Sequence, residues 1–146
     1  MKRALAISEK QLGAEHPDLA DSLSNVAMLY MEQGRYMDAE PLLNRALAIS
    51  KEHLRAEHPS IAARLNNLAM LYKAQGRYAE AEPLMKRALA ISEKQLGVEH
   101  PNVATVLESY AALLRKTKRV AEAEKMEARA KTLRAKQIQV KTKHKS

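Results

Sequence analysis

The chain has 146 residues, with 25 Lys and Arg against 17 Asp and Glu, and it contains no Cys, Phe or Trp. The length suits one ordinary domain, and the absence of Cys excludes disulfides, thiolate catalysis and zinc–thiolate sites. The apolar run Ala4 to Ile7 is too short for a signal peptide or a membrane helix. We therefore expect a soluble, cytoplasmic protein that does not insert into membranes.

Positive charge is concentrated near the C-terminus. Residues 115–146 hold 12 Lys and Arg against 3 Glu, whereas residues 1–114 hold 13 basic and 14 acidic residues. The body is therefore neutral and only this C-terminal segment is basic. It has no aromatic side chain that could stack on bases and no strong apolar stripe for lipid insertion. We expect a solubilising role for this segment and do not expect nucleic acid as a partner.

The sequence repeats with a fixed period. The tripeptide Glu-His-Pro recurs at Pro17, Pro59 and Pro101, and residues 27–50 differ from residues 69–92 at only six of 24 positions. Such a period indicates stacked units, each of which buries its apolar face on its neighbours. Because residues 1–13 are identical to residues 85–97, we expect them to form the second half of a unit's second helix.

Each full unit contains two predicted helices, a first helix (helix A) and a second helix (helix B). Helix A is predicted at about residues 17–33 and 59–75, where the proline suits the first turn and apolar residues follow helical spacing. Gly34 and Gly76 end these helices, since glycine readily takes the positive φ of a helix C-terminus. Helix B is predicted to begin three residues after each glycine.

The third unit is degenerate. Lys118 replaces the turn glycine, and Glu127 and Lys131 stand where earlier units have leucine or methionine. A polar last helix suits a terminal cap, because nothing stacks outside it. Its helix B is predicted from about Val120 to Ala135. The predicted organisation is a partial helix B at 1–13, repeats at 17–54 and 59–96, a capping repeat at 101–136, and a basic disordered tail at 137–146.

A 42-residue helical repeat could be of the HEAT or armadillo kind by length alone, but the local pattern favours another family. Leu-x2-Leu-Ala-x2-Tyr, followed by Gly-x-Tyr-x2-Ala-x6-Ala, is the tetratricopeptide pattern. It is carried by Leu65, Leu68, Ala69, Tyr72, Gly76, Tyr78, Ala81 and Ala88. With its Glu-His-Pro phrases, the chain resembles the 42-residue repeats of kinesin light chain over about residues 1–131.

The resemblance implies an all-α fold, a right-handed α-solenoid of antiparallel helix pairs, in one domain over residues 1–136. It also implies that the A helices line a concave groove that binds peptides. In the family, the second Asn of Leu-Asn-Asn-Leu-Ala helps to hold the ligand backbone. That role carries over to Asn67 and Asn25, but not to Ser109 in Leu-Glu-Ser-Tyr-Ala.

Helical spacing independently places Asn67 opposite the apolar stripe of its helix. An amide can both donate to and accept from a peptide backbone, and methionine packs around varied side chains. The alternative is a plain solvated helix face. The candidate peptide-binding residues are Asp21, Asn25, Met28, Glu32, Asn66, Asn67, Met70, Lys73, Ser109 and Lys116.

The Glu-His pairs before each proline could suggest a metal site. One pair per stacked unit places the pairs on the order of 10 Å apart, too far to share an ion, so a structural role in the loops is favoured. No nucleophile–base set and no glycine-rich phosphate loop stands out. We predict no metal, no cofactor and no enzymatic activity.

The sequence therefore favours a non-catalytic scaffold that binds a peptide or protein segment in the groove of the A helices. Two alternatives stay open. The chain could self-associate by stacking through its N-terminal end, residues 1–12, or act as an anion-binding adaptor through its basic C-terminal segment.

Overall fold

The computed structural model describes residues 17–145, and within them the side chains of residues 18–139. This part of the chain is built from six α-helices and contains no strand. The bounds of the helices are α2 Pro17–Glu32, α3 Tyr36–His53, α4 Pro59–Ala74, α5 Tyr78–Leu96, α6 Pro101–Lys116 and α7 Val120–Lys145. The all-α solenoid is confirmed, and the half helix expected at residues 1–13 lies outside the described residues.

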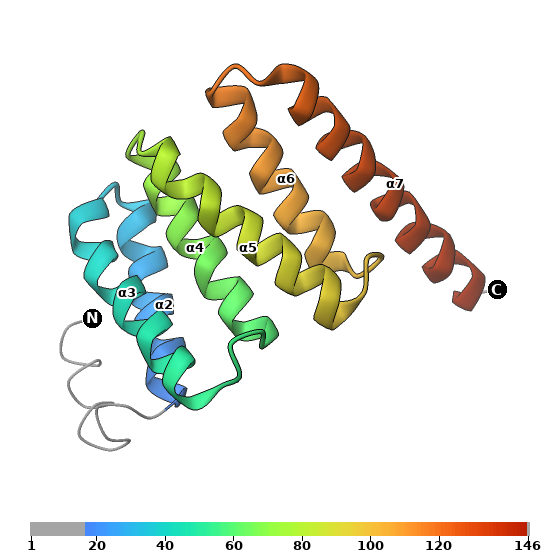
Figure 1. Cartoon of the computed structure of the whole chain (residues 1–146). Helices are drawn as coiled ribbons and strands as arrows, with labels where there is room; N and C mark the ends of the chain where they lie inside the picture. The colour runs from blue at the N-terminus through green and yellow to red at the C-terminus, as the bar shows by residue number, and fades with distance from the viewer. Residues whose placement is uncertain (1–16, 146) are drawn as a thin grey trace.

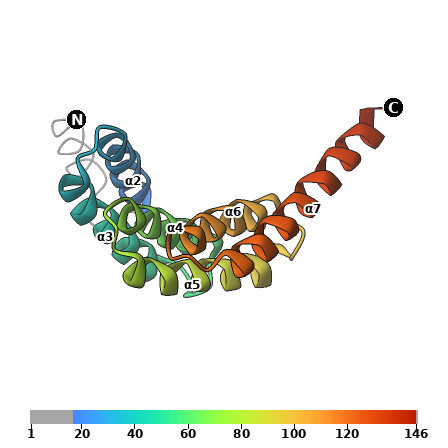
Figure 2. The same ribbon diagram turned by 90° about the horizontal axis from the view of Figure 1, so that it is seen from above.

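The helices form three antiparallel pairs, α2 with α3, α4 with α5 and α6 with α7, stacked side by side (Figure 1). Seen from above, the stack is an arch (Figure 2). The A helices α2, α4 and α6 lie on its concave side, and the B helices α3 and α5 lie on its convex side. Most contacts between neighbouring pairs join the B helix of one pair to the A helix of the next. The A helices of neighbouring pairs contact each other little.

Histidine and proline together fix where α4 and α6 begin. His58 and His100 are extended, as expected for a residue before proline, and the helix starts at the proline itself. The Nδ1 atom of His58 accepts a hydrogen bond of 3.0 Å from the backbone N–H of Ser60, and His100 caps α6 in the same way. These histidines are therefore N-cap residues, which gives the Glu-His pairs a structural role.

The turn from helix A to helix B has the same backbone in all three pairs. Gly34 and Gly76 have φ values of +74° and +76°, as the glycine spacing predicted. Lys118 has φ +63°, so the third turn keeps the left-handed conformation without glycine. A non-glycine residue there is strained by contact between its Cβ and the carbonyl oxygen.

Replacing Lys118 by glycine should therefore raise the free energy of unfolding by about 1 kcal/mol. The measurement is urea unfolding followed by helical circular dichroism. Lys125→Gly, the same change inside α7, is the control and should instead lower it by roughly 1 kcal/mol. A destabilised Lys118→Gly variant would contradict this account of the turn.

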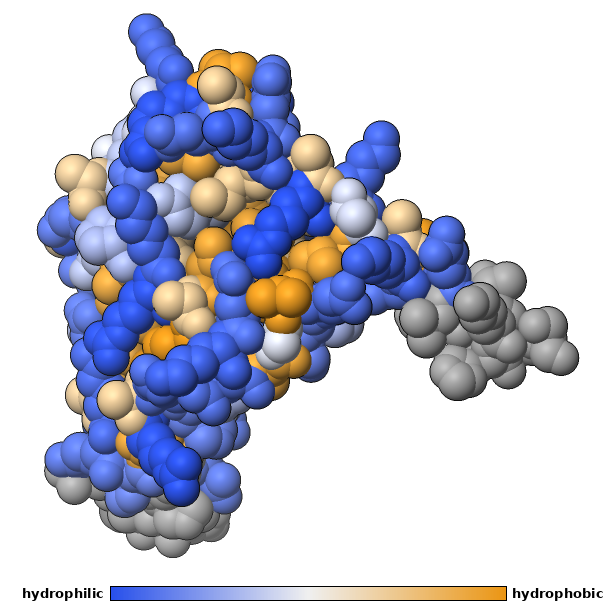
Figure 3. Space-filling model, turned by 45° about the vertical axis from the view of Figure 1, so that its right-hand side comes forward, coloured by the Kyte–Doolittle hydropathy of each residue, from blue (hydrophilic) through white to orange (hydrophobic). Residues whose placement is uncertain are grey.

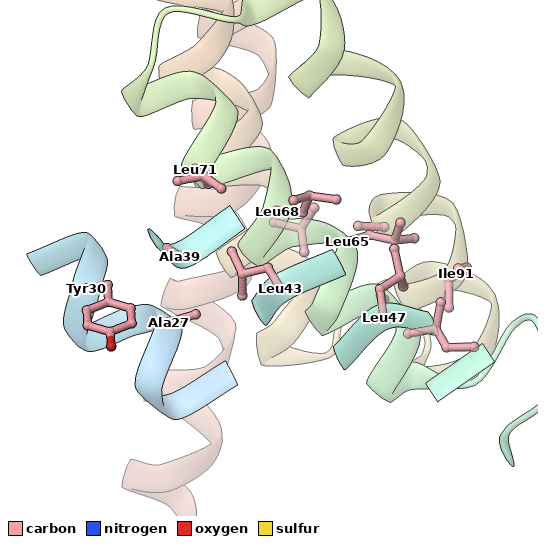
Figure 4. Close-up of a cluster of buried hydrophobic side chains, with 13 residues drawn as sticks. Ala27, Tyr30, Ala39, Leu43, Leu47, Leu65, Leu68, Leu71 and Ile91 are labelled. Atoms are coloured by element: carbon pink, nitrogen blue, oxygen red, sulfur yellow. The ribbon is translucent and has the colours of Figure 1, made fainter. Parts of the chain in front are cut away.

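The core continues from one pair to the next. Leu71 of α4 is fully buried in one cluster with Ala39 and Leu43 of the preceding helix α3 (Figure 4). Leu113, one period later in α6, is 1% exposed and lies in a cluster with Ala81 and Met85 of α5. Helices α4 and α6 are thus each covered by the B helix of their own pair and by the B helix of the preceding pair.

A polar contact recurs beside this core. Arg77, in the turn between α4 and α5, stacks on the ring of Tyr72 at 4.2 Å and donates to Glu40 of the preceding pair at 2.8 Å. One period later, Arg119 donates to Glu82 at 2.6 Å, and the hydroxyl of Tyr110 donates to the same carboxylate at 2.9 Å. The arginines of the second and third turns therefore each join their unit to a glutamate in the unit before it.

Helix α7 ends later than expected. The sequence predicted an end near Ala135 and disorder at residues 137–146, whereas the helix continues to Lys145. Residues 136–145 contain neither Gly nor Pro, and adding one residue to an existing helix avoids the cost of nucleation. The helix is polar as a cap requires, with Glu127 paired to Arg115 and Lys131 exposed.

Candidate functional site

All ten candidate residues lie on the A helices α2, α4 and α6, the helices of the concave face. Asn25 is exposed, and Asn67 is half-buried. The two methionines are less free than expected, because Met28 and Met70 are both half-buried. The remaining groove residues are exposed except for Asn66, which is buried, and Lys73 and Ser109, which are half-buried.

The seam between α2 and α4 is closed by an ion pair. A guanidinium nitrogen of Arg64 on α4 contacts the carboxylate of Asp21 on α2, and only 13% of the Arg64 side chain is exposed. The Nε atom of Arg64 has no hydrogen-bond partner, and neither has the buried hydroxyl of Ser24 on α2. Asp21 is thus engaged with its neighbouring helix, a role that its predicted place in the groove did not indicate.

The seam between α4 and α6 is open. Val106 of α6 stands one repeat period after Arg64, so an apolar side chain replaces the arginine at this repeat position. A hollow of about 160 Å³ lies here. The α4–α6 hollow is lined by Pro59, Ala62, Ala63, Asn66, Asn67, Ser92, Asn102, Thr105 and Val106.

Asn66 is the most constrained polar group of the hollow. Its side chain is only 9% exposed, and its amide nitrogen faces the sulfur of Met70 at 3.8 Å. Its Oδ1 atom has no hydrogen-bond partner. A buried amide oxygen without a donor is unusual, because almost all buried polar atoms are paired.

One end of the groove is positively charged. Lys73 of α4 is half-buried, and its pKa is lowered first by burial and then by the charge of Lys116 on α6. A lowered lysine pKa means that the ammonium form is disfavoured there. An acidic ligand group near both lysines would relieve this repulsion.

The sequence located most of these residues but ranked them differently. It singled out Asn67, whereas the buried amide whose oxygen lacks a partner belongs to the neighbouring Asn66. Helical spacing also places Thr105 on this face, but it did not point to Arg64 or Asn102. Comparing repeat positions could have found Arg64, since Ser22 and Val106 occupy that position in the other units.

Within residues 17–139, no three His, Asp or Glu side chains gather closely enough to hold a metal ion. On the outer face, a shallow hollow of about 550 Å³ lies beside Leu89, Tyr110 and Met126, with Lys86 and Lys94 at its rim. On the face drawn in Figure 3, hydrophobic residues lie between hydrophilic ones. None of the described helices is long and apolar enough to cross a membrane.

A family model described as "Tetratricopeptide repeat" matches residues 1–52, 19–91 and 60–136. Among curated proteins, no sequence matches the chain. Solved structures of tetratricopeptide-type repeats are similar to the chain.

A putative kinesin light chain of Podosopora anserina, with nearly identical tetratricopeptide-like repeats, is 32% identical to the chain, with a TM-score of 0.79. The match covers 94% of this chain and 65% of that one. BtubC (BKLC) of P. vanneervenii is 25% identical with a TM-score of 0.83, over 93% of this chain and 54% of that one. The tetratricopeptide domain of Arabidopsis FLU shares the fold. It is 16% identical to this chain with a TM-score of 0.65, and the match covers 82% of this chain and 95% of that one. The chain therefore spans about 65% of the first of these relatives and 54% of the second.

Proposed function

Since the chain belongs to the tetratricopeptide repeat family, whose repeats generally mediate protein–protein interaction, we propose that it is a non-catalytic cytoplasmic scaffold. It would bind an extended peptide segment in its concave groove. The segment would run across α2, α4 and α6. Its backbone would bond to Asn25, Asn66 and Asn67.

One observation supports this proposal above the others. Among the described side chains, three buried polar atoms lack a hydrogen-bond partner: Ser24 Oγ, Arg64 Nε and Asn66 Oδ1. All three lie on the A helices α2 and α4, and Ser24 and Asn66 occupy the same repeat position. Each unpaired buried polar group costs about 1–3 kcal/mol. A ligand whose backbone reached these groups after a local side-chain rearrangement would recover part of this cost, which favours a polar ligand here.

The α4–α6 hollow suggests the chemistry of the ligand. Its walls combine apolar carbons of Ala63 and Val106 with the polar groups of Asn66, Asn102 and Thr105. A volume of about 160 Å³ leaves room for one small or medium side chain. We expect a ligand that places such a side chain in the hollow and donates a backbone N–H to Asn66 Oδ1. An acidic residue would suit the end of the groove near Lys73 and Lys116.

The test uses peptides selected from a random phage-displayed library on the full chain. Replacing Asn25 and Asn67 together by alanine should weaken binding of a selected peptide by about tenfold or more, because two backbone hydrogen bonds are lost. Asn66→Ala should weaken it as well. The dissociation constants would be measured by calorimetry.

Asn44→Ala is the matched control, because Asn44 is an exposed asparagine on helix α3 of the convex side. Its peptide affinity should equal that of the unmodified chain. An unchanged dissociation constant in the Asn25→Ala, Asn67→Ala double variant would overturn groove binding.

A further inference from the structure

The α4–α6 hollow is rich in amide groups. It lies between two A helices of the concave side (Figure 2), and three of the chain's five asparagines, Asn66, Asn67 and Asn102, are among its nine lining residues. None of these nine residues carries a charge. The hollow therefore offers hydrogen-bond donors and acceptors together, without a charged group among its lining residues.

The seam between α2 and α4 shows the same place occupied by charged side chains. Asp21 and Arg64 stand one repeat period before Ala63 and Val106, and their ion pair crosses from α2 to α4. The short side chains of Ala63 and Val106 cannot form such a bridge. A ligand side chain can therefore enter the α4–α6 hollow without breaking an ion pair between these two positions.

Charged side chains fit the hollow poorly. A charge that leaves water for a neutral hollow loses its hydration without gaining a partner of opposite charge. Arg134 of α7 does donate to Thr105 at 3.0 Å, but Arg134 is not a lining residue. Its guanidinium is already paired with Glu108 at 2.9 Å. A ligand carboxylate or ammonium in the hollow is therefore disfavoured.

An apolar side chain fits only part of the walls. It would pack on Ala63 and Val106, but it would cover the amides of Asn67 and Asn102 without bonding to them, which is unfavourable. A glutamine or asparagine side chain suits both parts, because its carbon stem packs on the apolar walls while its amide both donates and accepts. Rotation of the Asn66 side chain toward this amide would also give its unpaired Oδ1 atom a donor. An amide oxygen has two lone pairs, so Oδ1 can accept from the ligand's backbone as well.

We propose that the α4–α6 hollow selects a neutral amide side chain, from a glutamine or asparagine of the bound peptide. This selectivity rests on the proposed peptide binding in the groove and adds the chemical identity of one ligand residue. Peptides selected on the full chain from the random phage-displayed library should therefore share glutamine or asparagine at one position.

The experiment changes that residue in a selected peptide and measures the dissociation constant on the full chain by calorimetry. One replacement removes the amide at similar size, with methionine for glutamine or leucine for asparagine. The other converts the amide to the corresponding carboxylate and adds a charge. Each replacement should weaken binding about tenfold or more, the first through unpaired amides and the second through a desolvated charge. The same replacements at a peptide position without residue preference are the control.

A double variant of the chain tests whether the hollow is the source of the preference. Ala63→Asp with Val106→Arg rebuilds the ion pair of the α2–α4 seam, so it should fill the hollow and remove the preference for the amide. Asn44→Asp with Ala48→Arg adds the same two side chains at exposed positions of α3 and should leave the preference intact. Helical circular dichroism checks that both variants fold, and the peptide replacements on the unmodified chain decide the outcome without them.

The results separate this selectivity from groove binding itself. Selected peptides that need Asn25 and Asn67 but share no amide position, or that tolerate both replacements of the amide, would overturn the selectivity and leave groove binding standing. An amide preference that persists in the folded Ala63→Asp, Val106→Arg variant would also overturn it. An affinity that Asn25→Ala with Asn67→Ala leaves unchanged would instead overturn groove binding, and the selectivity with it.

Discussion

Replacing Leu71 by alanine should lower the free energy of unfolding by about 3 kcal/mol. The side chain is completely buried where α4 meets α3, in the cluster with Leu43 and Ala39. Truncation removes apolar contacts and leaves a cavity that close-packed helices fill only in part. In a stack of repeats each joint holds neighbouring units together, so the loss should weaken the whole array. Urea unfolding followed by circular dichroism measures the change.

The repeat provides a matched control for this substitution. Leu29→Ala removes the same atoms at the same repeat position, but Leu29 is 43% exposed. The expected loss is below about 1 kcal/mol, because less apolar area returns to water and no closed cavity forms. Equal losses of unfolding free energy at the two positions would contradict a stabilising role for the burial of Leu71 between α3 and α4.

Glu82→Gln should lower the free energy of unfolding by about 2 kcal/mol at neutral pH. The carboxylate of Glu82 accepts hydrogen bonds from Arg119 at 2.6 Å and from the Tyr110 hydroxyl at 2.9 Å, and 21% of its side chain is exposed. A neutral amide cannot replace both charge-assisted bonds, so Arg119 would lose its partner in the preceding unit. Stability is again measured by urea unfolding.

The effect should depend on pH in a defined direction. Burial acts to raise the pKa of Glu82, but hydrogen bonds from Arg119 and Tyr110 outweigh it, so the pKa is lowered from 4.5. A carboxyl with a lower pKa in the folded state contributes its full stability above the unfolded pKa and loses it as the pH falls through the folded pKa. The difference between the unmodified chain and Glu82→Gln should therefore be constant near neutral pH and shrink below pH 4.5.

Glu124→Gln is the control for Glu82, because Glu124 occupies the same repeat position and is exposed on the last helix. It should change stability little at any pH. A stability loss at Glu124 equal to that at Glu82 would indicate a general effect of net charge and would contradict the role of the contact with Arg119 and Tyr110.

The sequence determined the architecture. The fixed repeat period, the prolines at the starts of the A helices and the glycines at their ends predicted the helix pairs. The observed bounds differ only slightly, except that α7 continues to Lys145. These are local signals, since proline and glycine restrict the backbone at their own positions. The stacking followed because each apolar stripe needs a neighbouring unit to cover it. The same reasoning placed all the groove candidates on the A helices.

Only the tertiary structure decided which groove residues are free to bind. The Arg64–Asp21 pair closes one seam while Val106 leaves the next one open, and Asn66 is buried without a partner for its oxygen. The two helices that meet at each seam belong to different repeat units, so helical periodicity within one helix cannot tell which side chain faces another. The exposure of Leu29 became apparent in the same way, since its counterparts Leu71 and Leu113 are buried by neighbouring helices. Burial and pairing depend on neighbours brought together by packing, whereas the helices themselves depend on residues close in the chain.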